Sequence, residues 1–115
     1  MAIDNDFLLM LTSSGIGQGE PDLGEKLMGA FLEKLFESEQ LPAKIICINS
    51  GIFLTTEGST MLEVLEKFEN EGSQILSCGT CLAYFDRTEK LRIGQPTNMK
   101  DTVEAMLDFS KIISP

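Results

Sequence analysis

Apolar residues along the chain gather in short unbroken runs, separated by longer segments of helical periodicity. The runs lie at 6–13, 43–49 and 73–78, and a weaker one follows at 111–114. A short apolar run is typical of a strand that is buried on both faces of a sheet. The pattern therefore predicts three strands, with a candidate for a last strand at 111–114.

Between the first two runs, apolar residues recur every three or four positions, as they do in a helix with one buried face. The helix is expected to begin at Asp22, since Glu25 follows three residues later with the spacing of a capping box. Pro42 is expected to interrupt the chain before the second strand. The apolar stripe of this helix consists of Leu27, Met28, Phe31, Leu32, Leu35 and Phe36.

Three more helices are predicted further along. One ends before Gly72, a short one covers 79–85, and the last covers 101–109. The segment at 92–98 has neither period and is expected to be irregular. The residues expected to face the core are Met61, Leu62, Leu65 and Phe68 in the first of these helices, and Val103, Met106 and Leu107 in the last.

Strands that alternate with helices require crossover connections, which favour a parallel sheet covered on both faces. We therefore predict an α/β fold with three α/β/α layers, a mostly parallel central sheet of four to five strands, and a single domain over 1–115. Functional groups in such sheets gather at the carboxyl ends of the strands. The loops at 13–22, 49–56 and 78–81 are expected to converge there.

Composition removes several classes of function. The formal net charge is −9, which disfavours a nucleic-acid surface, because phosphate contacts need clustered Lys and Arg. The chain has no His, so neither Ser-His nor Cys-His nucleophile pairs are available. No stretch approaches the about 18 apolar residues of a membrane span, and the acidic N-terminus does not resemble a secretory signal. We expect a cytoplasmic protein with neither nucleic acid nor membrane as partner.

Three glycines, Gly15, Gly17 and Gly19, follow the first strand, where a nucleotide-binding loop would lie. Their spacing does not fit G-x-G-x-x-G, and the P-loop lysine is replaced by Glu25. The loop is therefore expected to be flexible or tightly turned, and it could serve as a lid or a docking surface.

The three cysteines differ in setting. Cys47 lies between two isoleucines in a predicted strand and is expected to be part of the core. Cys78 and Cys81 form a C-x-x-C motif where the third strand gives way to a short helix. The positive end of a helix dipole lowers the pKa of a thiol at that place, and Cys81 lies one turn away.

Four roles are open for this motif. A zinc site needs four ligands and the chain supplies one cysteine pair, so we expect no metal. A thioredoxin-like dithiol would lie in the first βαβ unit rather than after the third strand. A sulfur carrier needs only one nucleophilic thiolate and no histidine. The fourth role is packing of both thiols beneath a loop.

Several segments together resemble a known family. They are "GIGQGEPDLGEKLM", "NSGIFLTTEGS", "ILSCGTCLAYF" and "KLRIGQPTNM", each following a predicted strand in order except the last. The chain resembles DsrE-like sulfur-relay proteins over roughly residues 6–114, and is most similar to the DsrE-like domain of YedF-type proteins, which are described as sulfurtransferase-like selenium metabolism proteins. The resemblance implies an α/β/α fold and a cysteine near the end of the third strand that accepts persulfide sulfur.

The resemblance also implies partners. Members form oligomers, so a homo-oligomer is expected, a trimer or hexamer, or a dimer. Many YedF-type chains carry a TusA-like domain with a Cys-Pro motif at the N-terminus. This sequence has none. We therefore expect a small TusA-like sulfur carrier as a separate partner protein; the alternative is an isolated module whose function has drifted. No cofactor is expected.

We accordingly predict a sulfur-relay protein in which Cys78 accepts the sulfur and Cys81 is the partner thiol. The alternatives are a non-catalytic oligomeric binding or regulatory module and a dithiol redox switch. The residues expected to shape the site are Gly15, Gly17, Gly19, Asn49, Gly51, Gly79, Thr80 and Asn98.

Overall fold

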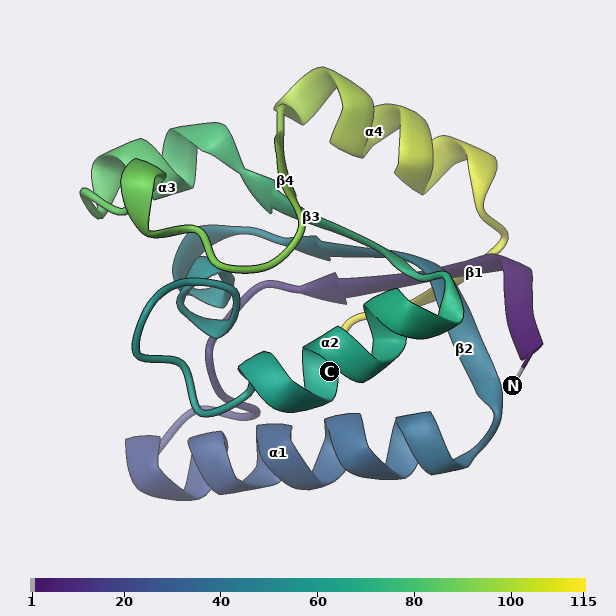
Figure 1. The fold of residues 1–115 in the computed structure, drawn as a ribbon, viewed down its shortest axis with the longest axis horizontal. Coiled ribbons are helices and arrows are strands. Elements are labelled where there is room, and N and C mark those ends of the chain that lie inside the picture. The colour runs from purple at the N-terminus through teal and green to yellow at the C-terminus, as the bar shows by residue number, and fades with distance from the viewer. Residues whose placement is uncertain (1) are drawn as a thin grey trace.

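The computed structural model describes residues 2–115 and is built around a five-stranded sheet (Figure 1). The strand order is β4-β3-β2-β1-β5, and every neighbouring pair is parallel. This confirms the predicted parallel sheet and its upper strand number. The strands are β1 (Ala2–Leu11), β2 (Gln40–Cys47), β3 (Gln74–Cys78), β4 (Gln95–Thr97) and β5 (Lys111–Ile113).

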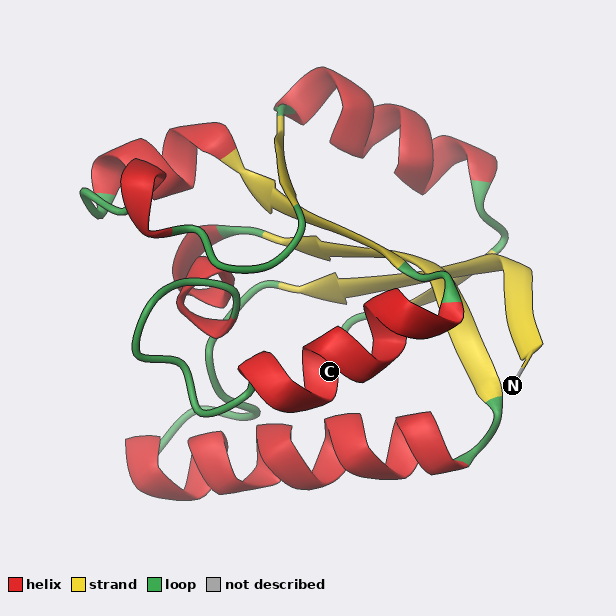
Figure 2. Ribbon diagram, viewed as in Figure 1, coloured by secondary structure: helices red, strands yellow, loops and turns green. Residues whose placement is uncertain are grey.

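Helices cover both faces of the sheet, which gives the three predicted layers (Figure 2). Helices α1 (Pro21–Glu37) and α2 (Leu62–Glu71) lie side by side on one face, and α4 (Met99–Asp108) crosses the other. Helix α3 (Gly79–Tyr84) continues directly from the carboxyl end of β3. Two short 3-10 segments, η1 (Asn49–Leu54) and η2 (Thr88–Lys90), complete the loops at this end.

The core has two parts because the side chains of each strand alternate between the two faces. Phe7, Leu9 and Leu11 of β1 join the larger cluster beneath α1 and α2, whereas Leu8 and Met10 join the smaller one beneath α4. All five are at most 2% exposed. The unbroken apolar run therefore does mark a strand buried on both faces. Buried Cys47 lies in the larger cluster, as the sequence predicts.

Several predicted boundaries are wrong: the first two strands span 2–11 and 40–47 rather than 6–13 and 43–49. Two further differences, at the start of α1 and at Pro42, involve prolines. Helix α1 begins at Pro21 with Glu20 as its N-cap, and no side chain caps it, so Asp22 lies inside the first turn. Proline suits the first helical position, because the N–H that it lacks would have no partner there and its φ is already helical. The helix therefore starts at Pro21, one residue before the predicted start at Asp22. Pro42 lies within β2 rather than before it, paired with Asp4 of β1.

The segment expected to be irregular contains an edge strand. Residues 95–97 form β4, which pairs with β3 through Leu76–Gln95 and Cys78–Thr97. A proline in the middle of this strand, Pro96, is tolerated because an edge strand has only one hydrogen-bonded side. Three residues are too few to establish a period in sequence, so the pattern missed this strand.

Helix α4 turns a different face to the sheet than predicted. Its buried residues are Thr102 and Ala105, whereas the apolar residues expected to face inward are exposed, Leu107 to 79%. The cap defines where the helix begins: Asn98 accepts the Asp101 N–H through Oδ1 at 2.8 Å, and the Thr102 hydroxyl donates to the Asn98 carbonyl at 2.9 Å. The exposed residues are Met99, Val103, Met106 and Leu107.

Among the described residues, no helix is both long and apolar enough to cross a membrane.

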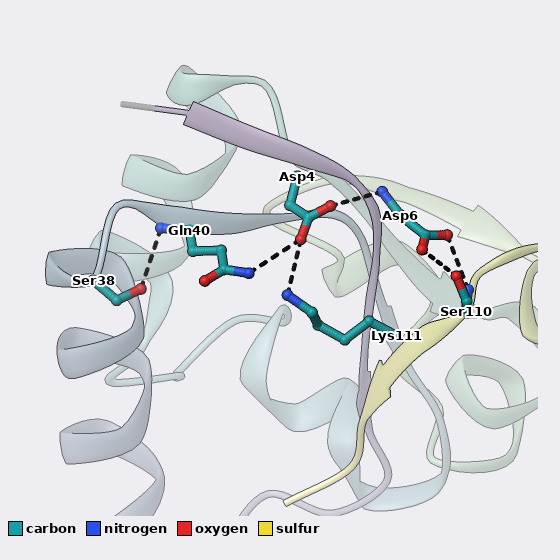
Figure 3. A network of polar contacts seen from close by, with 6 residues as sticks. All are labelled: Asp4, Asp6, Ser38, Gln40, Ser110 and Lys111. Atoms are coloured by element: carbon teal, nitrogen blue, oxygen red, sulfur yellow. Dashed lines mark hydrogen bonds and ion pairs between the residues drawn. The ribbon is translucent and has the colours of Figure 1, made fainter.

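A polar network fastens β5 to the sheet (Figure 3). The Asp4 carboxylate accepts Lys111 Nζ at 2.9 Å and Gln40 Nε2 at 3.2 Å. Asp6 accepts both the backbone N–H and the hydroxyl of Ser110. The β1–β2 register shifts between Asp4 and Leu8, so β1 bends here and its next residues pair with β5. Because β5 is short and lies at the edge, it makes few backbone hydrogen bonds to the sheet. The side-chain network supplements those bonds and holds β5 against β1.

The Asp4 carboxylate gives this network a pH dependence. Its hydrogen bond to Lys111, followed by those to the Asp6 N–H and Gln40, lowers the pKa of Asp4 from 3.8 to about 2. A lowered folded-state pKa stabilises the fold above the unfolded pKa, and this contribution is lost as pH falls from about 4 through about 2. We predict that Asp4→Asn lowers the urea midpoint at pH 7 and that its difference from wild type shrinks towards pH 2.

Asp108→Asn is the matched control, because this exposed carboxylate has no hydrogen bond or ion pair among the described residues. It should not reproduce the pH-dependent difference. An Asp4→Asn effect that stays constant from pH 7 to pH 2 would contradict the assignment.

Candidate functional site

The C-x-x-C motif spans the junction of β3 and α3. Cys78 is the last residue of β3 and the N-cap of α3, and Cys81 lies in the first turn of the helix. Cys78 is 5% exposed, while Cys81 is half-buried, and both thiols are free. The Cys78 side chain makes no capping hydrogen bond to the helix. The more exposed sulfur is therefore that of Cys81.

The turn after β2 aims a backbone donor at Cys81. Asn49 has a left-handed φ of 50°, and its N–H donates to Cys81 Sγ with an N-to-S distance of 3.1 Å. The preceding N–H, of Ile48, donates to the carbonyl oxygen of Leu11 at 3.0 Å. A Cβ built on Gly51 would overlap that same oxygen, so only glycine fits there. The end of β1 thus sets the position of the turn.

Two buried hydroxyl groups contact each other beside the cysteine motif, where Ser77 precedes Cys78. Ser77 and Thr55 are both 0% exposed, and their side-chain oxygens are 2.7 Å apart. The Thr55 hydroxyl donates to the Ile52 carbonyl at 3.1 Å, so the proton between the two side chains comes from Ser77. This pairing satisfies both groups and ties β3 to η1.

An open hollow lies in front of Cys81. It has a volume of about 500 Å³ and is lined by Asn49, Thr80, Cys81, Tyr84 and Phe85. We call it the Cys81 pocket. Tyr84 and Phe85 follow Cys81 at three and four residues, so they share its side of the helix. Tyr84 is 83% exposed, and the sulfur therefore sits in an apolar surround that stays open to an approaching molecule.

Burial is the first cause that raises the pKa of Cys81, followed by its hydrogen bond to Cys78. The Asn49 N–H acts in the opposite direction and favours the thiolate. Burial alone raises the pKa of Cys47 to about 12. Both groups thus hold their protons at neutral pH, and Cys81 differs in having a donor ready to stabilise its anion.

The residues predicted for the site fall into two groups. Asn49 and Thr80 line the Cys81 pocket, and Gly79 lies in the same turn, where an added Cβ would be 3.3 Å from the Thr97 carbonyl. Gly51 supports the Asn49 turn without lining the pocket. Asn98 caps α4 instead.

The glycine loop also lies outside the Cys81 pocket. Gly15 allows close packing on Gly24 of α1, and the Ile16 N–H donates to the Gly24 carbonyl at 3.0 Å. Gly17 and Gly19 have φ of 81° and 130°, which glycine adopts without strain. The loop thus packs against the start of α1 through Gly15 and Ile16.

Tyr84 and Phe85 are the pocket residues that the sequence analysis did not identify. Their spacing of three and four residues from Cys81 was the available signal. Within residues 2–115, no three His, Cys, Asp or Glu side chains are grouped to hold a metal ion.

Alkylation distinguishes the three thiols. We predict that iodoacetamide labels Cys81 first, Cys78 more slowly and Cys47 last, as followed by peptide mass spectrometry. Cys78→Ala should shift the midpoint of Cys81 labelling to lower pH, because it removes the hydrogen bond that favours the Cys81 thiol. Cys47→Ala, a substitution elsewhere in the core, should leave that midpoint unchanged. Preferential labelling of Cys78 would contradict this order.

Comparison with known proteins identifies solved structures that have the same fold. No protein-family model matches the sequence, and no curated protein matches it. Protein MTH1491 of unknown function from Methanobacterium thermoautotrophicum is similar in structure, with a TM-score of 0.72 at 10% identity, covering 97% of this chain and 100% of that one. The ychN protein from E. coli has a TM-score of 0.65 at 15% identity, with the same coverage. Such identities establish the fold alone, and the all-parallel five-stranded sheet with helices on both sides is the DsrE-like fold.

Proposed function

We propose that this protein relays sulfane sulfur through its C-x-x-C motif, with Cys81 as the acceptor and Cys78 as the partner thiol. The observation that carries the proposal is the placement of Cys81 Sγ, which lines an open pocket and accepts the Asn49 N–H. A nucleophilic sulfur needs this combination of access and a donor for its anion. The resemblance of the CGTC segment to sulfur-relay proteins supports the same role.

The geometry favours Cys81 over the sequence-based choice of Cys78. Position at a helix start favours Cys78, but its side chain is 5% exposed and makes no capping bond. A donor molecule reaches Cys81 first, because Cys81 and not Cys78 lines the pocket. Cys78 is buried at the start of the same helix, three residues before Cys81, which suits a second thiol that acts after the first.

Transfer of sulfur from a persulfide to a cysteine is a thiol exchange and needs no external oxidant. The Cys81 thiolate attacks the terminal sulfur of a donor persulfide, the donor S–S bond breaks, and the donor leaves as a thiolate. Cys81 then carries a persulfide, and its terminal sulfur passes to an acceptor thiolate by the same displacement. Alternatively, Cys78 attacks Cys81 Sγ, which releases hydrosulfide and leaves a Cys78–Cys81 disulfide that an external dithiol must reduce. Selenium in place of the transferred sulfur would follow the same steps.

The raised pKa of Cys81 lowers its thiolate fraction at neutral pH and so slows its attack on a sulfur donor. Thiolate is the attacking form, so sulfur uptake rises with pH until the thiol has ionised. The Asn49 N–H remains in place to bond the anion that forms.

A small sulfur-carrier protein of the TusA-like kind is the donor or acceptor that fits this surface. The pocket is open and rimmed by Tyr84 and Phe85, whose rings meet edge to face at 5.1 Å. Exposed aromatic residues are common anchors in protein interfaces.

A dithiol redox switch is the second candidate. Both thiols are free and lie three residues apart at the start of α3, a spacing typical of dithiol redox pairs. Oxidation would then close the pair and remove Cys81 as an acceptor. The two functions differ in product, since a switch gains no sulfur atom.

We predict that incubation with a persulfide donor adds about one sulfur atom to the wild-type protein in intact mass spectra. Cys81→Ser should abolish the gain, whereas Cys78→Ser should retain it and release the sulfur more slowly. Cys47→Ser is the control and should behave as wild type if it folds. Loss of two hydrogens without added sulfur would favour the switch, and equal gain by the Cys78→Ser, Cys81→Ser double variant would refute the proposal.

Self-association completes the proposed function. The exposed stripe on α4, which includes Val103, Met106 and Leu107, is an apolar surface of the kind that proteins cover by assembly. We predict that the wild type is a homo-oligomer in light scattering and that Met106→Glu with Leu107→Glu makes it monomeric without unfolding it. Lys100→Glu is a control on the same helix that adds charge outside the stripe. A monomeric wild type would contradict this part of the proposal.

A further inference from the structure

A second hollow lies at the same end of the sheet as the Cys81 pocket. We call it the Arg87 pocket; it has a volume of about 250 Å³. It is lined by Arg87 and Glu25, by the hydroxyl residues Ser14, Ser59 and Thr60, and by the apolar residues Phe53 and Met61, among others. It shares no lining residue with the Cys81 pocket. The rings of Phe53 and Phe85, one from each pocket, have centroids 4.8 Å apart and lie between them.

The Arg87 side chain is held in place before any ligand arrives. Its Nη1 donates to Thr56 Oγ1 at 3.1 Å and to the Glu57 carbonyl at 2.9 Å. The guanidinium carbon lies 4.6 Å from the centroid of the Phe53 ring. These contacts use one nitrogen and one face, so Nε and Nη2 are left to donate to a ligand. A fixed guanidinium fork loses little entropy when it binds a carboxylate.

Arg87 carries a charge that the described residues do not neutralise. No ion pair with a carboxylate is present for it in residues 2–115. Glu57 also lines the pocket, but its carboxylate pairs with Arg92 at 3.5 Å. Half-buried Arg87 is therefore a free cation in the wall of a hollow, a setting in which an anionic group gains a charge-assisted hydrogen bond.

Glu25 supplies the opposite charge to the same hollow. It lies in the first turns of α1 and makes no ion pair within the described part of the chain. Its carboxylate accepts only the Thr60 hydroxyl, at 3.4 Å. Ser59 Oγ accepts the Met61 N–H at 3.0 Å, so its proton remains available to donate. The pocket thus presents one cation and one anion that have no ion pair in the described residues, Arg87 and Glu25, with hydroxyl donors around an apolar wall.

We infer that the Arg87 pocket binds a small zwitterion of the α-amino-acid class, with its carboxylate on Arg87 and its ammonium on Glu25. A ligand that is only anionic meets Glu25 and a chain of net charge −9, and one that is only cationic meets Arg87. A zwitterion satisfies both. The volume lies below the roughly 300–1,000 Å³ of sites for drug-sized ligands and suits a molecule of this size.

The test is a titration of the isotope-labelled chain, followed by amide chemical shifts in NMR spectra. L-Alanine is compared with propanoate, which lacks the ammonium, and with ethylamine, which lacks the carboxylate. We expect saturable shifts around Ser59, Thr60 and Arg87 with L-alanine. Binding of either single-charge analogue should be weaker by about tenfold or more, as loss of a charged hydrogen bond implies.

Two variants test the assigned charges. Glu25→Gln and Arg87→Gln should each weaken L-alanine binding by about tenfold or more. Glu25 is exposed, so its variant keeps the test valid if Arg87→Gln unfolds the loop. Glu33→Gln is the matched control, since it removes the same charge from the same helix outside the pocket and should bind as wild type.

Three results would overturn the inference: no saturable shift with L-alanine, equal affinity for propanoate, or wild-type binding by Glu25→Gln. The Cys78→Ser, Cys81→Ser double variant separates this site from sulfur relay. It should bind L-alanine as wild type does, whatever the outcome of the sulfur-transfer experiment.

Discussion

The carbonyl oxygen of Leu11, at the end of β1, is the contact on which the functional end of the sheet depends. It accepts the Ile48 N–H as β2 ends, and Gly51 packs against it so closely that no side chain fits. Together these contacts fix the turn in which Asn49 adopts a left-handed conformation and turns its N–H to Cys81 Sγ. The position of the candidate nucleophile thus follows from how two neighbouring strands end.

The loops beyond this turn are joined to one another by main-chain and buried polar contacts, which connect the walls of the two hollows. Thr56 and Leu91 form an antiparallel bridge, and the Arg92 N–H donates to the Thr55 carbonyl at 2.9 Å. Thr55 also meets Ser77 beneath the cysteines. Since η1 contributes Asn49 to one pocket and Phe53 to the other, its position determines the shape of both.

The order of strands and helices could be predicted from sequence because buried parallel strands leave strong apolar runs. The prediction failed where the signal was short or had another cause. Three-residue β4 has too few residues for a period, and Pro42 is accommodated inside β2. On α4, the strongest apolar stripe marks the exposed side, whereas Thr102 and Ala105 face the sheet. Periodicity identifies an apolar face but not whether the same chain covers it.

The motif was visible in sequence, but its arrangement was not. Spacing places Cys78 and Cys81 on one helix turn, whereas burial of Cys78 and the Asn49 donor depend on contacts between distant segments. The most direct test of the account is a crystal structure after treatment with a persulfide donor. We predict an additional sulfur atom bonded to Cys81 Sγ in the pocket beside Tyr84 and Phe85, with Asn49 still oriented towards the site. An additional sulfur on Cys78, with Cys81 unmodified, would contradict it.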